Sequence, residues 1–433
     1  MAVISRLTRR LLPFLFLLYI VAYLDRINVG FAALQMQQQL RFNDAVYGLG
    51  AGMFFAGYFL FQVPSNLVLR RLGARRWISV LMIAWGAISS AMILVKTPTS
   101  FYVLRFLLGL AEAGFFPGII LYLRGWFPSR ARARTVARFM TAAPLSGVIG
   151  GPLSGALLGL HGTGHLSGWQ WMFLLEGLPA VVLGIVVYFY LTDCPQDAHW
   201  LSEEERAWLM NALNDEQTSN SAARTNFLAA FTNPAVWILG LVYFGLNTVS
   251  YGVSLWLPNL IHSLSGVSTL VIGIISAIPY IAAAFVMVLV GLHSDRTGER
   301  RWHLAVPAFT GAVALLLAAY STSVIAVIAS ISLALVGVFS MVGPFWAMPS
   351  SLLAGTAAAA GIAFINSIGN LGGFFGPYII GLVRTSTGNF KGGLLVVGGT
   401  LTVSGCLALL VGPHKKVSAD GQAEIGPASY PPR

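Results

Sequence analysis

Five ionisable residues stand inside otherwise apolar stretches of the chain, and their types are those that handle protons and small anions. They are Asp25, Arg26, Arg105, Glu112 and Glu176. A charge at the middle of a bilayer costs roughly 2.5–3.5 kcal/mol on insertion scales, so such residues normally face a bundle interior or a wet cavity. A carboxylate can take up a proton, and a guanidinium can bind a carboxylate through two parallel hydrogen bonds. The pattern predicts a buried site for protons and an anion.

The spacing of these residues leaves two interpretations open. Arg105 and Glu112 are seven residues apart, which places them on one face of a helix about two turns from each other. In the functional interpretation all four residues from Asp25 to Glu112 serve the buried site. In the alternative, Arg105–Glu112 and Asp25–Arg26 are structural ion pairs that hold helices in register. Glu176 lies near an expected helix end, where a structural anchor is the favoured interpretation.

The stretches that position these residues are long enough to cross a membrane. Of 433 residues, 56% are hydrophobic and only 9% are charged, whereas a soluble domain has roughly a quarter of its residues charged. Continuous apolar runs of about twenty residues indicate membrane helices and exclude a barrel of alternating strands. The sequence predicts an all-α integral membrane protein with spans at 11–33, 46–69, 77–95, 101–123, 136–160, 170–191, 235–260, 268–292, 303–321, 324–348, 356–383 and 392–412.

The twelve spans divide into two related halves. We expect one six-helix bundle over 1–191, a cytoplasmic linker over 192–234, a second bundle over 235–412 and a disordered tail over 413–433. The linker segment from Ser202 to Leu213 has a Ser-x-x-Glu start that predicts a surface helix.

Two motifs recur at an offset of 225 residues. Arg70 to Trp77 resembles Asp295 to Trp302, and the glycines of Gly147 to Pro152 recur in Gly372 to Pro377. Two related six-span halves are typical of transporters whose site lies at the midplane between the repeats.

The net charge of +11 is explained by where the basic residues lie. They cluster at 6–10, 70–76, 124–138 and 296–301, each after an even number of spans, while the opposite loops hold few. The positive-inside rule then places both termini in the cytoplasm, and the alternation with the spans argues against a nucleic-acid partner. Cys194 and Cys406 form no disulfide framework, and we find no metal-ligand spacing, cofactor motif or enzyme motif.

Four segments carry a resemblance to a known family. They are Tyr23 to Gly30, Gly57 to Asn66, Arg105 to Pro117 and Trp171 to Pro179. They resemble the anion:cation symporter family of the major facilitator superfamily, and within it most of all the bacterial tartrate, phthalate and hydroxyphenylacetate transporters. Transporters of sugar acids such as galactonate are somewhat less similar. The resemblance implies a fold of two pseudo-symmetric six-helix bundles.

The resemblance also implies roles for individual residues. Asp25 and Glu112 match the proton-coupling carboxylates of the family, and Arg26 matches the arginine that engages the substrate anion. The positions that line or support the central site are matched by Tyr23, Tyr58, Arg105, Trp346 and Asn366, with Asn370 one helical turn further on.

Charge counting leads to the same function. When both carboxylates are ionised they balance the two arginines, and protonation would free the guanidiniums for an organic anion. We therefore expect a monomeric, proton-coupled symporter for a small organic anion in the bacterial inner membrane, surrounded by lipid. The alternatives are an exchanger of organic anions or phosphate esters and, less favoured, a sensor that does not transport.

Three further features of the sequence concern gating and packing. The superfamily's loop motif is intact at Gly291 to Arg300, where Asp295, Arg296 and Arg300 are expected gating residues, but Asn66 and Arg70 replace its glycine and aspartate in the first half. The glycine run from Gly147 resembles a motif of proton antiporters, although close helix packing is the favoured explanation. The aromatic stretch from Tyr243 to Trp256 could line the cavity or face lipid.

Overall fold

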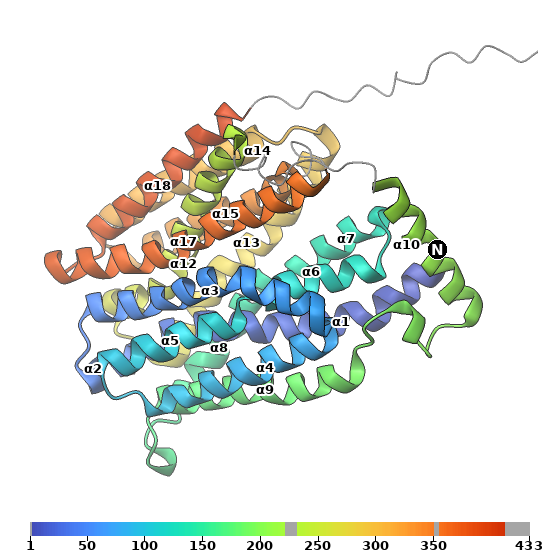
Figure 1. Ribbon diagram of the computed structural model, residues 1–433. Coiled ribbons are helices and arrows are strands. Elements are labelled where there is room, and N and C mark those ends of the chain that lie inside the picture. The colour runs from blue at the N-terminus through green and yellow to red at the C-terminus, as the bar shows by residue number, and fades with distance from the viewer. Residues whose placement is uncertain (1, 221–231, 350–354, 412–433) are drawn as a thin grey trace, which may run out of the picture.

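The computed structural model describes residues 2–220, 232–349 and 355–411, and the regular elements in these ranges are helices throughout (Figure 1). The first half contains α1 (Ala2–Ile27), α2 (Val29–Leu40), α3 (Asp44–Leu72), α4 (Ala74–Ala91), α5 (Pro98–Glu112), α6 (Phe115–Trp126), α7 (Ser129–Met140), α8 (Ala142–Leu158) and α9 (Gly168–Tyr190). The second half contains α12 (Pro234–Ser265), α13 (Thr269–Thr297), α14 (Trp302–Tyr320), α15 (Val324–Ala347), α17 (Gly355–Thr387) and α18 (Lys391–Leu410).

Twelve spans account for these helices. Eleven are long and apolar enough to cross a membrane by composition, and some consist of consecutive segments, as in Val3–Leu40, which joins α1 and α2. The twelfth is the 33-residue α17, which covers the predicted span at 356–383. The predicted all-α membrane fold is therefore confirmed. Many helices run beyond the predicted bounds, because about twenty residues suffice to cross the hydrocarbon and the ends continue past it.

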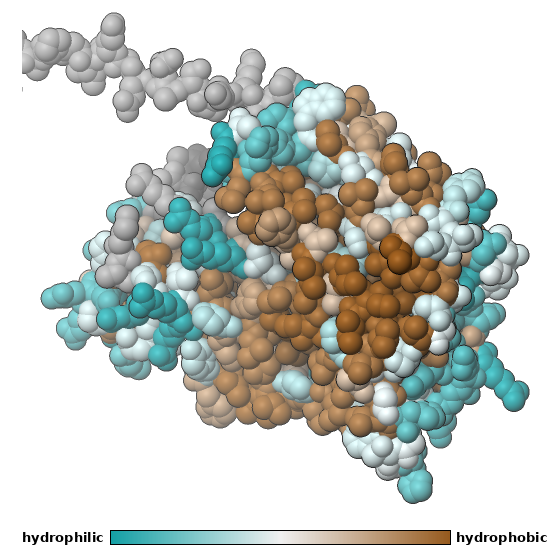
Figure 2. Space-filling model, turned by 180° about the vertical axis from the view of Figure 1, so that it is seen from behind, coloured by the Kyte–Doolittle hydropathy of each residue, from teal (hydrophilic) through white to brown (hydrophobic). Residues whose placement is uncertain are grey.

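The surface matches this assignment. Figure 2 shows a band of hydrophobic residues across the middle of the molecule, with hydrophilic residues gathered at its two ends. Large apolar side chains such as Phe189, Phe285 and Ile325 are 78%, 68% and 81% exposed. Exposed apolar area on this scale is stable only against lipid, so the band marks the membrane-facing surface.

The linker between the halves begins with the short helix η3 (Pro195–Asp197) and continues as α10 (Glu203–Asn220). The predicted capping box is present, since Glu205 N donates to Ser202 Oγ at 3.2 Å and Ser202 N donates to the Glu205 carboxylate at 3.1 Å. The predicted surface helix is therefore confirmed. The division at 192–234 stays a prediction, and the tail at 413–433 lies outside the described residues.

The halves contact each other closely at one end of the molecule. We call the end that holds the start of α1, the α3–α4 turn and α10 the linker end, and the opposite end the far end. At the far end, Arg384 Nη1 lies 2.9 Å from Asp44 Oδ1, and Ala45 N donates to Thr385 Oγ1 at 2.8 Å. A Cβ added to Gly48 would lie 2.6 Å from the carbonyl oxygen of Pro377, so α3 and α17 meet backbone to backbone.

The glycine run of α8 likewise allows helices of the two halves to approach each other closely. Cβ atoms added at Gly147, Gly151 and Gly155 would overlap Tyr280, Gly273 and Thr269 of α13. Only glycine permits this approach, so the packing explanation of the run is confirmed. The pairs α3–α17 and α8–α13 join the two halves on opposite sides of a central interface.

Candidate functional site

The central feature of the interface is a buried ion pair between Arg26 and Glu112. Arg26 Nη2 lies 2.9 Å from Glu112 Oε2, and the two side chains are 8% and 0% exposed. Arg26 is the second-last residue of α1 and Glu112 is the last residue of α5, so each stands where a span is interrupted. The alternative interpretation of the sequence expected the ion pairs Asp25–Arg26 and Arg105–Glu112. In the described part of the chain neither pair is formed, and Arg26 pairs with Glu112 instead.

Arg26 also connects the two halves. Its Nη1 donates to the hydroxyl of Tyr251 on α12 at 3.2 Å, and its guanidinium lies 5.2 Å from the ring centres of both Phe54 and Tyr58 on α3. Aromatic faces attract a desolvated cation, so the rings hold the guanidinium in place beside the interface. Among the predicted residues, Tyr58 is thus in direct contact with Arg26.

Tyr251 was missed by the sequence reasoning, although a signal was present. Arg26 and Tyr251 are separated by 225 residues, the offset at which the motifs of the two halves repeat. They therefore occupy equivalent positions in the two halves. The stretch from Tyr243 to Trp256 is largely buried, which decides between the two alternatives in favour of the protein interior.

Arg105 is the second cation of the site. It is fully buried on α5, and its guanidinium lies 5.1 Å from the ring centre of Phe54, which Arg26 also contacts. Within the described residues none of its three guanidinium nitrogens has a hydrogen-bond partner. A buried guanidinium with all its donors free is suited to an anionic ligand, because leaving buried donors unmatched is costly.

Asp25 faces away from this interface, into the first half. Its Oδ1 accepts a hydrogen bond from Ser89 on α4 at 2.7 Å and a longer one from Asn28 at 3.4 Å. Asn28 also lies beside Glu176, whose Oε1 accepts from Ser154 at 2.7 Å. Asp25 and Glu176 therefore form a second acidic cluster, separate from the Arg26–Glu112 pair and bridged by one amide.

The second half contributes neutral groups. Trp346 on α15 meets Tyr243 edge to face with ring centres 5.1 Å apart, and Asn247 Nδ2 donates to the carbonyl of Gly369 at 3.0 Å. Asn366 and Asn370 lie one turn apart on α17 on either side of this crossing, the first half-buried and the second 7% exposed. Aromatic faces and amides can shape a binding cavity and fix the orientation of a ligand without adding charge.

Tyr23 belongs to the same interior. It is 4% exposed on α1, with its ring centre 6.3 Å from that of Tyr19. It lies three residues before Arg26, on the first half's side of the interface.

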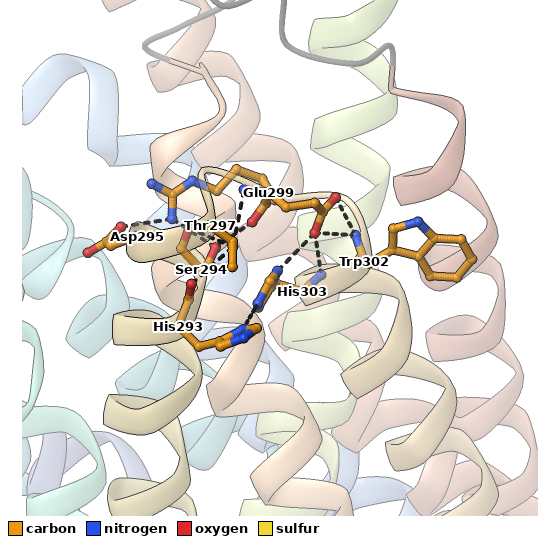
Figure 3. A network of polar contacts seen from close by, with 8 residues as sticks. His293, Ser294, Asp295, Thr297, Glu299, Trp302 and His303 are labelled. Carbon is orange, nitrogen blue, oxygen red and sulfur yellow. Dashed lines mark hydrogen bonds and ion pairs between the residues drawn. The ribbon is translucent and has the colours of Figure 1, made fainter.

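The loop motif that holds the predicted gating residues lies at the linker end between α13 and α14 (Figure 3). Arg300 Nη1 lies 2.8 Å from Asp295 Oδ1 and donates to Ser294 Oγ at 2.8 Å. Ser294 in turn donates to the carbonyl of Glu299 at 2.7 Å, so the turn is closed by its own side chains. Arg296 is exposed near the end of α13.

Comparisons with known proteins find relatives that are named as transporters. The chain is 51% identical over 99% of its length to a protein of Agrobacterium vitis named "Putative tartrate transporter", which it covers to 98%. It is 44% identical over 90% of its length to a protein of Acinetobacter baumannii named "Quinolone resistance transporter", which it covers to 91%.

Solved structures show the same fold. The crystal structure of a bacterial homolog of the human lysosomal transporter Spinster matches with a TM-score of 0.76 at 17% identity, over 92% of this chain and 95% of that one. The relatives are transporters, which confirms the expectation that the chain is not an enzyme. The family model described as Major Facilitator Superfamily matches residues 15–377, and the chain belongs to this superfamily of membrane transporters.

Proposed function

We propose that the chain is a proton-coupled symporter that takes up a small organic carboxylate across the bacterial inner membrane by alternating access. The observation that carries this proposal is the buried Arg26–Glu112 pair at the interface of the halves. One partner can be neutralised by a proton, and the other can bind a carboxylate. Arg105, buried without a hydrogen-bond partner in the described residues, offers a second guanidinium nearby.

The coupling follows from competition for Arg26. While Glu112 is ionised it occupies the guanidinium, and protonation releases Arg26 to form two charge-assisted hydrogen bonds with a substrate carboxylate. Proton binding therefore favours anion binding, and by linkage the anion favours the proton equally. Asp25 supplies a second proton site in this scheme. A dianion that moves with two protons carries no net charge across the membrane.

The switch between states uses the contact of Arg26 with Tyr251. When substrate takes the guanidinium, the contacts that join the halves at the centre change, and the halves can rock about the site. Asp44–Arg384 and the glycine contacts close the far end in this structure. The other state requires these contacts to open while the linker end closes, with Asp295, Arg296 and Arg300 as gating residues there.

The orientation follows from the basic residues. Arginines of the first half gather at the linker end, for example Arg6 beside Glu205 and Arg75 beside Asp193. The positive-inside rule makes this end cytoplasmic, so both termini lie in the cytoplasm and the far end faces the periplasm. A monomer is sufficient for the mechanism, since each chain contains both halves.

The names of the relatives point to the substrate class. Tartrate is a dicarboxylate and quinolones are aromatic carboxylic acids, so a carboxylate is the group that the two have in common. Two buried arginines can bind a carboxylate, and the aromatic side chains of the second half can contact the remainder of an aromatic or hydroxylated acid. The alternative is exchange of one organic anion for another, which would use the same arginines without net proton movement.

The test is uptake into proteoliposomes with an inward proton gradient. Tartrate, phthalate, hydroxyphenylacetate, galactonate and a quinolone would be supplied as labelled compounds, with and without an uncoupler. We expect uptake of at least one acid that collapses with the uncoupler. In Glu112→Gln, uptake against a gradient should be lost while exchange of internal for external acid continues.

The control is Glu204→Gln, which neutralises an exposed carboxyl of α10 outside the buried site. It should retain coupled uptake. Flux that ignores the proton gradient and requires an internal anion would replace the symporter with the exchanger.

A further inference from the structure

The turns after α3 and after α13 are repeats of each other, but their arginines find different partners. At the offset of 225 residues, Arg75 corresponds to Arg300 and Arg70 to Asp295. In the second half, Arg300 pairs with Asp295 inside its own motif. In the first half the corresponding acid is absent from the sequence, because position 70 is an arginine.

The missing acid is supplied from the linker. Asp193, three residues after the end of α9, places its Oδ2 3.4 Å from Arg75 Nε. Its Oδ1 accepts a hydrogen bond from the backbone N–H of Arg75 at 2.9 Å. This N–H belongs to the first turn of α4, where free amide groups and the helix dipole both favour a carboxylate. Asp193 therefore contacts Arg75 through side chain and backbone together.

The turn is shaped to receive this carboxylate. Gly73 has a φ of +83°, and a Cβ added there would lie 2.9 Å from Asp193 Oδ1. A larger residue would meet both a strained backbone and the carboxylate. The equivalent Gly298 also has a positive φ, of +69°, but nothing lies within 4 Å of its Cβ position. The two glycines share a positive φ but differ in ψ, which is 159° at Gly73 and 1° at Gly298. Only the backbone of the first turn leaves space for a carboxylate from outside the motif.

The linker is fixed to the first half at further points. Trp200 stacks on Trp126 of α6 with ring centres 5.5 Å apart, and the Arg10 guanidinium lies 4.8 Å from the Trp200 ring. Glu205 of α10 pairs with Arg6 of α1 at 2.6 Å. These contacts hold the start of the linker against the first half.

We propose that Asp193 replaces the aspartate that the first-half motif lacks, and that it ties the start of the linker to the α3–α4 turn. Asp193 is in this role a positioning residue. It holds Arg75 and the start of α4, and it makes the turn's arrangement depend on the linker. The second-half turn has no such dependence, since its acid and arginine belong to one loop. This role in the conformational cycle rests on the proposed transport function.

A native cysteine reports on the tether. Cys194 follows Asp193 directly, and its thiol donates to Asp197 Oδ2 at 3.0 Å. Burial, together with the hydrogen bond to Asp197 and the charges of Asp197 and Asp193, raises the pKa of the Cys194 thiol. Because the thiolate is the reactive form, Cys194 should react slowly with a maleimide while the linker start is held.

The first measurement is the maleimide labelling rate of Cys194 in purified protein with Cys406→Ser in the background. Asp193→Asn removes the charge-assisted contacts to Arg75. Because this pair is partly exposed and lies at a helix N-terminus, its loss should raise the labelling rate by about fivefold. Asp193→Glu should stay within about twofold of the parent. Glu205→Gln breaks a different linker contact and should leave the rate unchanged. Asp193→Asn also removes a charge that raises the pKa of the Cys194 thiol, so Arg75→Gln, which breaks the same contact and keeps that charge, should raise the rate as well. An unchanged rate in Arg75→Gln would overturn the tether.

The second measurement tests whether Asp193 takes over the role of the motif's aspartate or only stabilises the turn. Asp193→Asn should slow uptake, and adding Arg70→Asp should restore it, because the acid then returns to its motif position. In this double variant Cys194 should still label fast, since the linker remains untied. If the double variant took up substrate no faster than Asp193→Asn, Asp193 would not replace the aspartate of the motif. Labelling needs no substrate, so the tether can fail or succeed independently of the symport proposal.

Discussion

The two halves of this protein share a fold but divide the chemistry between them. Among the described residues, the buried charged side chains belong to the first half, and they are Asp25, Arg26, Arg105, Glu112 and Glu176. The buried polar side chains of the second half are amides and hydroxyls, as in Asn247, Ser254 and Asn370. The repeated scaffold is suited to a motion that the halves perform together. The comparison teaches that buried charge can be concentrated in one half while the other half supplies shape and hydrogen bonds.

The contact between Arg26 and Tyr251 shows this division at one point. The residues occupy equivalent positions, yet one is a permanent cation and the other a neutral phenol. A second cation at position 251 would repel Arg26 across the interface. A phenol instead accepts a hydrogen bond from Arg26 and keeps its hydroxyl proton available. The two equivalent positions can therefore contact each other because they hold different residues, a cationic hydrogen-bond donor and a neutral acceptor.

The largest effect is expected from removing the cation of the first half. Arg26→Ala leaves Glu112 buried without its partner, and breaking a buried pair in this way costs about 3–5 kcal/mol. We expect a strongly lowered melting temperature and no uptake of any acid. Thermal unfolding in detergent and proteoliposome uptake measure the two consequences separately.

The double variant Arg26→Ala/Glu112→Gln distinguishes stability from function. It removes both charges, so much of the melting temperature should return while uptake stays absent. Recovery of uptake in the double variant would show that Arg26 is needed only to neutralise Glu112, and the charge would then have no role in substrate binding.

A smaller effect is expected from the second half. Tyr251→Phe removes one hydrogen bond from the charged Arg26, worth about 1.5–3 kcal/mol, so the KM for uptake should change by about ten- to 150-fold. Proton coupling should persist, because Glu112 and Asp25 are untouched. The matched control is Tyr280→Phe, whose ring packs against Gly147 of α8 rather than against Arg26. Loss of coupling in Tyr251→Phe would contradict the division between the halves.

The sequence predicted the spans, the repeat and which ionisable residues are buried, because hydropathy and rarity of charge are local properties. It did not predict which partners meet. Asp25 and Arg26 are neighbours in sequence but point about 100° apart on a helix, so one enters the first half and the other reaches the interface. Arg105 and Glu112 share a helix, yet Glu112 pairs with a residue of another span.

The role of Asp193 was equally outside local reasoning. Its sequence neighbours say nothing of Arg75, and only the folded linker brings the two within 3.4 Å. The replaced aspartate at position 70 was visible as a departure from the motif, but the substitute lies more than a hundred residues away.

The smallest effect concerns the starts of α4 and α14, which the two halves cap differently. Glu299 accepts hydrogen bonds from the backbone N–H of Trp302 at 2.9 Å and from His303 Nδ1 at 2.8 Å (Figure 3). The equivalent residue in the first half is Ala74, the first residue of α4, and there the Asp193 carboxylate accepts from the backbone N–H of Arg75 instead. Burial raises the pKa of the Glu299 carboxyl, but these hydrogen bonds outweigh it and hold the pKa below its ordinary value of 4.5.

The sign of the pH dependence follows. A carboxyl whose pKa is lowered on folding contributes stability above its unfolded pKa, and this stability is lost as pH falls through the folded pKa. Glu299 is 35% exposed, so Glu299→Gln should cost less than about 1 kcal/mol at pH 7. Melting temperatures of the parent and the variant should differ at pH 7 and converge as the pH falls through the lowered pKa of Glu299 in the folded protein. A difference that persisted at low pH would mean that the shape of Glu299, rather than its charge, caps α14, and the parallel with Asp193 at α4 would fail.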